Sequence, residues 1–231
     1  MTWVKICGMT NLEDGLLAVE AGADAVGFVF YESSPRCVSA ETAREIVKKL
    51  PDSIEKIGVF AGHSMENAVH TSRYAGFDAI QVYPLTHKPG AEGDLEAVAK
   101  DTSELKVYVA LPITVLLGEG NGNVGLSRER AARLLDVLFL DSGNSQQPGG
   151  TGRTFDWRQA SSAVKELSLR QKVVIAGGLT AENVNEAIEV LNPFGVDVVS
   201  GVEASPGKKD PEKVQAFVRA VRAADRKAGQ G

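Results

Sequence analysis

The segment Lys172–Ser200, KVVIAGGLTAENVNEAIEVLNPFGVDVVS, contains one complete copy of the pattern that decides the fold. An aliphatic run at 172–176 is followed by apolar residues at helical spacing and then by a second aliphatic run at 196–200. Such runs are typical of parallel strands buried on both faces, and the spaced apolar residues predict the helix that joins them. The segment is therefore interpreted as a strand–helix–strand unit.

The same alternation extends over the whole chain. Strands are predicted at 3–6, 25–30, 56–60, 79–82, 106–111, 137–141, 172–176 and 196–200. Helix starts between them are marked by a capping box at Thr10–Glu13, by Asp210-Pro211, and by Ser39, Ser64, Ser127, Asp156 and Thr180. Three Gly-x-Asp-x-aliphatic segments, at Gly22, Gly76 and Gly195, predict helices that end at glycine before a strand.

Eight units in 231 residues give about 29 residues each, close to the ~30 of a strand–helix unit. We therefore expect a single (β/α)₈ TIM barrel domain over residues 1–231, with an open doubly wound sheet as the alternative. The fifth unit is irregular because 116–125 is glycine-rich without helical period, which leaves only 127–135 for a helix. The polar tail at 224–231 is expected to fray.

Composition restricts the function classes. Apolar residues make up 43% of the chain and the net charge is −5, which favours a soluble protein and argues against nucleic-acid or anionic-membrane partners. Neither a membrane-spanning run nor a signal layout is present, so a cytoplasmic location is expected. The two cysteines, Cys7 and Cys37, and the three histidines have no metal-ligand spacing, so no metal is expected.

In a barrel, the active site is built at the carboxyl ends of the strands. Lys5 and Cys7 share one face of the first strand, and the aliphatic neighbours Val4 and Ile6 take the other, so Lys5 and Cys7 are predicted to point inward. Asp141 ends the sixth strand at the same rim. A strand-end cysteine is often only a small buried hydrophobe and a strand-end aspartate often only caps a turn, so each residue alone is a weak signal.

Small residues follow strands six, seven and eight and predict a phosphate site. Unhindered backbone amides at helix starts attract anions, and barrel phosphate sites are frequently built after strands seven and eight. The candidate residues are Gly149, Gly150, Thr151, Gly152, Gly177, Gly178, Ser200 and Gly201.

Five segments together resemble the phosphoribosylanthranilate isomerase family of tryptophan biosynthesis, in order and from about Val4 to Val218. They are VKICGMT (4–10), GFVFYESSPR (27–36), LDSGNSQQPGGTGRTFDW (140–157), AGGLTAENV (176–184) and GVDVVSGVEASPGKKD (195–210). The resemblance implies a (β/α)₈ barrel without cofactor that converts N-(5-phosphoribosyl)anthranilate into 1-(2-carboxyphenylamino)-1-deoxyribulose 5-phosphate, an Amadori rearrangement.

The resemblance also implies roles for individual residues. Cys7 would be the general base and Asp141 the general acid, Arg36 would hold the anthranilate carboxylate, and the glycine loops would hold the phosphate. Lys5 and Gln81 are further candidate substrate contacts. Independently of the resemblance, a nearby cation such as Lys5, or a helix N-terminus, would lower the pKa of the Cys7 thiol. Gln81 is retained from a family Gln-Leu-His-Gly pattern, but Tyr83-Pro84 replaces its histidine and glycine. The expected partner is a small phosphorylated substrate, with the protein a monomer or homodimer.

Two alternatives remain open at this point. One is a related phosphosugar barrel: the histidine-pathway isomerase has aspartate at the position of Cys7, and indole-glycerol-phosphate synthase has an extra N-terminal helical segment. The other is a catalytically silent barrel that binds a phosphorylated ligand, which would require neither Cys7 nor Asp141.

Overall fold

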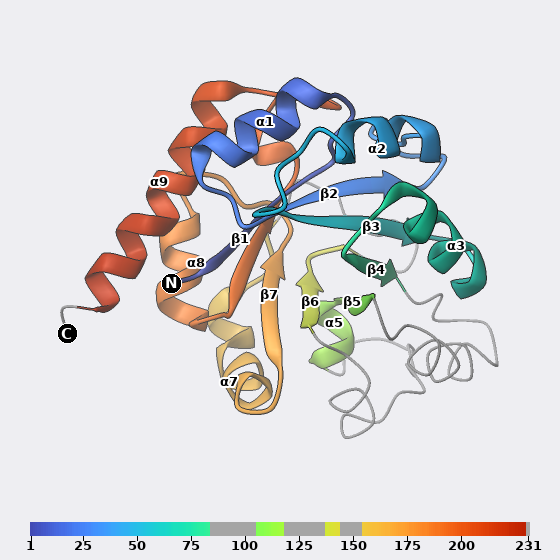
Figure 1. Cartoon of the computed structure of the whole chain (residues 1–231). Helices are drawn as coiled ribbons and strands as arrows, with labels where there is room; N and C mark the ends of the chain where they lie inside the picture. The colour runs from blue at the N-terminus through green and yellow to red at the C-terminus, as the bar shows by residue number, and fades with distance from the viewer. Residues whose placement is uncertain (84–104, 118–136, 144–153, 230–231) are drawn as a thin grey trace.

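The structure, a computed structural model, describes residues 1–83, 105–117, 137–143 and 154–229. Eight parallel strands close into one barrel in sequence order, and β1 pairs with both β2 and β8 (Figure 1). The strands are β1 Trp3–Cys7, β2 Ala25–Phe30, β3 Glu55–Ala61, β4 Ala79–Tyr83, β5 Lys106–Pro112, β6 Val137–Asp141, β7 Lys172–Ala176 and β8 Gly195–Val198. The predicted TIM barrel is confirmed, and the open doubly wound sheet is wrong because the sheet is closed.

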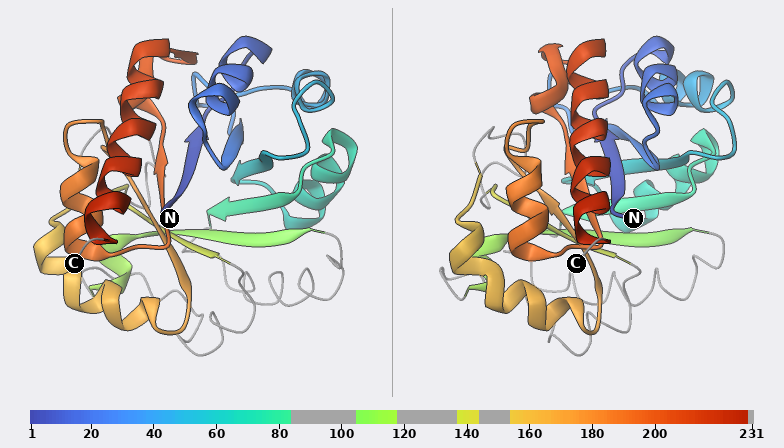
Figure 2. Two further views of the ribbon diagram at one scale, coloured as in Figure 1. Left: turned by 60° about the vertical axis from the view of Figure 1, so that its left-hand side comes forward. Right: turned by 90° about the vertical axis from the view of Figure 1, so that its left-hand side faces the viewer.

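The described helices lie outside the barrel, and α9 packs beside α1 and α8 (Figure 2). The helices are α1 Leu12–Ala21, α2 Ala40–Val47, α3 Met65–Ala75, α5 Ile113–Leu116, α7 Trp157–Ser168, α8 Val184–Leu191 and α9 Pro211–Ala228. In the irregular fifth unit the short α5 follows β5 directly, and the predicted helix at 127–135 lies outside the described residues. Within the described ranges, no helix combines the length and apolar character needed to cross a membrane.

Most predicted helix caps are confirmed, namely those at Ser39, Ser64, Asp156 and Asp210. Two are wrong. The cap of α1 is Asn11, because the Thr10 hydroxyl instead donates to the Gly207 carbonyl at 2.6 Å. Helix α8 begins after Asn183, whose side chain accepts from the Thr180 amide at 2.8 Å. The predicted cap at Ser127 lies outside the described residues.

Glycine ends two of the three helices for which the repeat predicted it. Gly22 and Gly76 follow α1 and α3 with φ of 85° and 81°, a left-handed conformation that is least costly for glycine. The prediction is wrong for Gly195, because α8 ends at Asn192 with φ of 47°. Gly195 opens β8, where a Cβ would lie 2.7 Å from the Trp3 carbonyl oxygen. Close approach of two strands, and not a helix end, requires this glycine.

The prediction that the tail at 224–231 frays is wrong for residues 224–228, which are helical. Helix α9 continues to Ala228, and Ala224 is buried. The Asp225 carboxylate accepts hydrogen bonds from the Thr2 amide at 2.9 Å and the Thr2 hydroxyl at 2.6 Å. These bonds fix the end of α9 to the start of β1, so the polar character of this segment reflects its outer face.

Each barrel strand has one face toward the helices and one toward the barrel axis. Val4 and Ile6 belong to the core between barrel and helices, whereas Trp3 and Cys7 belong to a second cluster inside the barrel. Lys5 also points inward, since its ammonium lies over the Phe139 ring of β6 at 5.3 Å. The predicted parity of β1 is confirmed, and the inward residues nearest the carboxyl ends form the floor of a pocket.

Candidate active site

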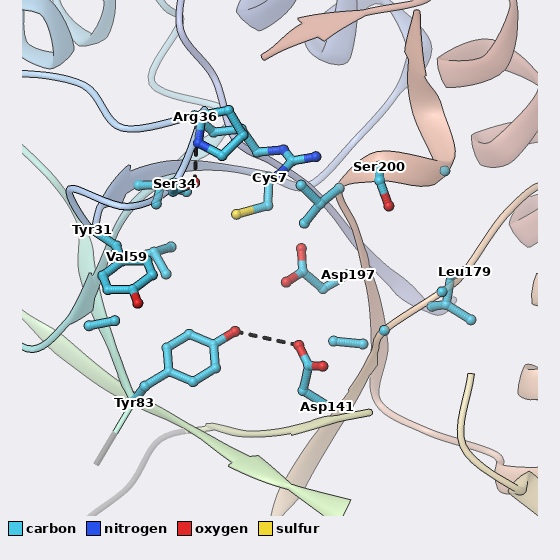
Figure 3. Close-up of a pocket in the computed structure, with 18 of the residues that line it drawn as sticks. Cys7, Tyr31, Ser34, Arg36, Val59, Tyr83, Asp141, Leu179, Asp197 and Ser200 are labelled. Carbon is cyan, nitrogen blue, oxygen red and sulfur yellow. Dashed lines mark hydrogen bonds between the residues drawn. The ribbon is translucent and has the colours of Figure 1, made fainter. Parts of the chain in front are cut away.

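A pocket opens at the carboxyl ends of the strands, where barrel enzymes place their chemistry. Its lining comes from β1, β2, β3, β4, β6, β7 and β8 and from the loops that follow β2, β7 and β8. Cys7, Arg36 and Asp141 all line it, although they are far apart in the sequence. Figure 3 places the Cys7 thiol and the Asp141 carboxylate on opposite sides, with Asp197 between them.

Cys7 lies in a tight environment at the end of β1. Its thiol packs over Gly27 of β2, where an added Cβ would lie 2.6 Å from Sγ. The Lys5 ammonium forms an ion pair with both Asp197 oxygens, at 3.0 and 3.1 Å, and the thiol lies near enough for its charge to interact with that ammonium. Lys5 is completely buried, and a buried ammonium is tolerable here because Asp197 balances its charge.

The pKa of the Cys7 thiol is raised, which corrects the prediction that Lys5 would lower it. Burial is the largest cause, because the thiolate is poorly solvated in the barrel. The Lys5 cation does act in the predicted direction, but the nearby Asp197 carboxylate opposes it. Lys5 shares its charge between thiol and carboxylate, so its effect on the thiol is smaller than a lone cation would have.

Asp141 ends β6 with its carboxyl group in the pocket. Burial raises the pKa of this carboxyl, and the Asp197 charge adds to the effect. The Gly143 amide donates to Asp141 Oδ1 at 2.7 Å and the Tyr83 hydroxyl lies 3.5 Å from Oδ2, and both hydrogen bonds oppose the rise. A raised pKa keeps more of this carboxyl protonated near neutral pH, as a general acid requires.

Arg36 lies in the loop after β2 and is fixed from behind. Its Nε donates to Glu203 Oε1 at 2.9 Å and its Nη2 donates to Oε2 at 2.7 Å. This bidentate pair raises the pKa of Arg36, so the guanidinium is permanently charged. Because Arg36 also lines the pocket, it can bind an anionic group there.

The loops after β7 and β8 bring small residues to the same pocket. Gly177, Gly178, Ser200 and Gly201 all line it. Gly177 has φ of 90° and Gly178 has φ of 63°, and a Cβ on Gly201 would collide with the Leu179 carbonyl oxygen. These positions therefore favour glycine, which leaves backbone close to the pocket. The other predicted phosphate residues, Gly149, Gly150, Thr151 and Gly152, lie outside the described residues.

Two predicted substrate contacts lie beneath the pocket. Lys5 is engaged with Asp197 and is absent from the lining formed by the described residues. Gln81 is also buried, and its Oε1 has no hydrogen-bond partner within the described part of the chain. Both residues are therefore buried, and neither is among the described residues that line the pocket.

Comparison with known proteins agrees with this geometry. The family model described as N-(5'-phosphoribosyl)anthranilate (PRA) isomerase matches residues 4–220. The chain belongs to this family. It is 40% identical over 224 residues to the N-(5'-phosphoribosyl)anthranilate isomerase of Pelobacter propionicus, which covers 95% of each chain. The predicted isomerase of tryptophan biosynthesis is thereby confirmed as a family and an enzyme class.

Solved PRA isomerases share the fold and most of the chain. A structure of monomers generated from a dimeric Thermotoga maritima enzyme aligns with a TM-score of 0.76 and 36% identity, over 96% of this chain and 100% of that one. A PRA isomerase in complex with reduced 1-(o-carboxyphenylamino)-1-deoxyribulose 5-phosphate aligns with a TM-score of 0.75 over the same shares. For this member of the family, monomer or homodimer stays a prediction.

The sequence analysis missed three residues of this PRA isomerase family site. Asp197 was predictable from strand parity. Its neighbours Val196 and Val198 face the helices, so Asp197 faces the barrel interior, where it lines the pocket. Tyr83 was noted only as a departure from the family pattern, yet it lines the pocket and approaches Asp141. Glu203 gave no local signal, because its partner Arg36 lies 167 positions away in the sequence.

Proposed function

We propose that this chain catalyses the isomerisation of N-(5-phosphoribosyl)anthranilate to 1-(2-carboxyphenylamino)-1-deoxyribulose 5-phosphate, with Asp141 as general acid and Cys7 as general base. Family membership supports the reaction. The observation that carries the residue assignment is that a thiol and a carboxyl group with a raised pKa face one pocket from opposite sides.

The proposed chemistry begins with ring opening. The Asp141 carboxyl donates its proton to the furanose oxygen, the C1–O bond breaks, and the nitrogen lone pair forms a C1=N bond. The Cys7 thiolate then removes the C2 hydrogen as a proton, and the C2–H electron pair forms a C1=C2 bond while the C1=N pair returns to nitrogen. Loss of the C2 hydroxyl proton and protonation of C1 give the aminoketone. Atoms and electrons balance within the substrate, so the reaction is redox-neutral.

The two pKa directions predict a bell-shaped dependence of kcat/KM on pH. The ordinary pKa is about 3.9 for aspartate and 8.5 for cysteine, and both are raised here. The productive form, a protonated Asp141 with a Cys7 thiolate, is therefore a minor form of the enzyme. Below the pKa of Asp141 the carboxyl is already protonated, and the thiolate fraction still falls. Above the pKa of Cys7 the thiol is already ionised, and the protonated fraction of Asp141 still falls. Asp141 therefore sets the acidic limb and Cys7 the alkaline limb.

We further propose that the substrate is held at its two charged ends. Arg36 would bind the anthranilate carboxylate through a guanidinium fork. Backbone amides around Gly177, Gly178, Ser200 and Gly201 would bind the phosphate, and the Gly149–Gly152 segment is proposed to complete this site. The bound compound in the related complex carries both a carboxyphenyl group and a 5-phosphate, which supports a two-ended arrangement.

The decisive experiment follows the loss of phosphoribosylanthranilate fluorescence with purified wild type, Cys7→Ala and Asp141→Ala. Each substitution should lower kcat by ~10²–10⁴-fold, the usual contribution of a general acid or base. Cys37→Ala and Asp52→Ala are matched controls, because both residues are exposed, and they should retain activity. An inactive wild type, or full activity in both site variants, would overturn the assignment.

A further inference from the structure

A buried charge cluster lies behind the pocket, where the chain turns back after β8. There an antiparallel hairpin is formed by two short strands, β9 Glu203–Ser205 and β10 Lys208–Lys209. In this hairpin Glu203 is directly opposite Lys209. Glu203 holds Arg36, and Lys209 Nζ donates to Glu203 Oε1 at 3.2 Å. The hydrogen-bonded side chains Arg36, Glu203 and Lys209 form the strand-end cluster, with two cations and one anion.

The ammonium of Lys209 makes all of its hydrogen bonds within the protein. Its side chain is completely buried, and its ammonium also donates to the Cys7 carbonyl at 2.6 Å and the Val199 carbonyl at 3.3 Å. An ammonium has three N–H donors, and these three acceptors account for all of them. Lys209 therefore has no donor left for a ligand, and its role is to tie the ends of β1 and β8 to Glu203.

Glu203 stays ionised despite burial. Burial alone would raise its pKa, but hydrogen bonding to Arg36 and the charges of Lys209 and Arg36 lower it. The Gly207 amide adds a hydrogen bond to Oε1 at 3.2 Å. Because Arg36 and Lys209 share this single carboxylate, the strand-end cluster carries a net charge of +1. Of these three residues, Arg36 is the one that lines the pocket.

The pairing with Glu203 determines which edge of Arg36 is available. Glu203 occupies the Nε and Nη2 edge of the guanidinium, whereas Nη1 has no partner among the described residues. The edge formed by Nη1 and Nη2 remains able to grip a second carboxylate in a bidentate manner. The Arg36 stem is also confined, because a Cβ on Gly8, the residue after Cys7, would lie 2.9 Å from Arg36 Cδ.

We propose that Glu203, anchored by Lys209, is a positioning residue that presents the free edge of Arg36 to the substrate carboxylate. The same cluster joins Arg36 to the backbone of Cys7, so the carboxylate site and the base keep a fixed spacing. This inference rests on the proposed function, because it concerns the carboxylate end of that substrate.

Glu203→Gln tests the proposal with little change of shape. The amide provides one acceptor where the carboxylate has two, so Arg36 loses its bidentate partner and its fixed orientation. We expect KM for phosphoribosylanthranilate to rise about tenfold, the range of one lost charge-assisted hydrogen bond, while kcat changes little. The exposed Glu45, paired with Lys48 on the surface, supplies the control Glu45→Gln, which should leave both constants unchanged.

Binding of two ligands separates positioning from general damage. The probes are reduced 1-(2-carboxyphenylamino)-1-deoxyribulose 5-phosphate and its phenylamino counterpart without the carboxylate, titrated by calorimetry. Glu203→Gln should weaken the carboxylated compound about tenfold and leave the other unchanged. Arg36→Lys should weaken it similarly, and adding Glu203→Gln to Arg36→Lys should cost nothing more, because Glu203 acts through Arg36.

The possible negative results distinguish the proposed function from the positioning role of Glu203. A wild type that neither turns over substrate nor binds the carboxylated compound overturns the proposed function. An active wild type with unchanged KM in Glu203→Gln, equal weakening of both compounds, or additive effects with Arg36→Lys overturns the positioning role alone. If Glu203→Gln does not fold, Glu203→Asp retains the charge that Lys209 needs. It should raise KM selectively through its shorter reach, and an unchanged KM in that variant likewise contradicts the proposal.

Discussion

Replacing Gly27 by alanine should disable the enzyme without removing any catalytic group. The new Cβ would lie 2.6 Å from Cys7 Sγ, 3.0 Å from Lys5 Cε and 3.1 Å from Lys5 Nζ. Ordinary contact begins near 3.4 Å, so the sulfur must move by about 0.8 Å, the difference between 3.4 and 2.6 Å. A displacement near 1 Å at a reacting group costs on the order of 10²-fold in rate. We therefore expect kcat to fall about 10²-fold, and overpacking to lower the free energy of unfolding by about 1–3 kcal/mol.

Gly58→Ala is the matched control on the neighbouring strand. Its Cβ would lie 2.6 Å from the Phe60 ring and 2.7 Å from the Phe77 ring, in the core between barrel and helices. Urea unfolding should show a similar loss of stability in both variants, whereas the fluorescence assay, run where both are folded, should show low kcat only in Gly27→Ala. Wild-type kcat in Gly27→Ala, or an equal loss in Gly58→Ala, would refute the claim that the thiol position limits catalysis.

Three further predictions concern the buried charges. Asp141→Asn should lower kcat by ~10²–10⁴-fold yet raise the melting temperature at neutral pH. The folded-state pKa of Asp141 is raised, so its ionised form destabilises the native state above that pKa, and the gain should vanish below about pH 4. An equal gain at pH 3 would contradict this origin. Tyr83→Phe removes a hydrogen bond that lowers the pKa of Asp141, so the acidic limb of the kcat/KM profile should move to higher pH while the alkaline limb set by Cys7 stays; an unmoved acidic limb would contradict it. Lys5→Met leaves Asp197 buried without its cation and should cost about 3–5 kcal/mol in urea unfolding, with partial recovery in Lys5→Met/Asp197→Leu; full wild-type stability in the single variant would show that the pair is unimportant.

Much of the fold followed from periodicities that are local in the sequence. The strand predictions at 25–30, 137–141 and 172–176 match the observed bounds, and parity placed Lys5 and Cys7 inside the barrel. The local signals failed where a distant segment competes. The sequence predicted Thr10 as a helix cap, but its hydroxyl donates to the Gly207 carbonyl. It predicted a frayed end of α9 because the hydrogen bond between Asp225 and Thr2 leaves no local signal.

The site was predictable in position but not in electrostatics. Strand ends and small-residue loops located Cys7, Asp141 and Gly177 at one rim. The raised pKa of Cys7 was not predictable, because it depends on burial and on how Lys5 divides its charge between the thiol and a carboxylate from β8. Long-range pairs of this kind arise only when the barrel closes.

The most direct measurement is a crystal structure of the wild-type protein with reduced 1-(2-carboxyphenylamino)-1-deoxyribulose 5-phosphate bound. We predict that Cys7 Sγ lies within contact of C2, that the Asp141 carboxyl lies on the opposite side near the oxygen that formed the ring, and that the aromatic carboxylate lies on Arg36. A compound seated with C2 beyond reach of Cys7, or with both groups on the same side, would contradict the account.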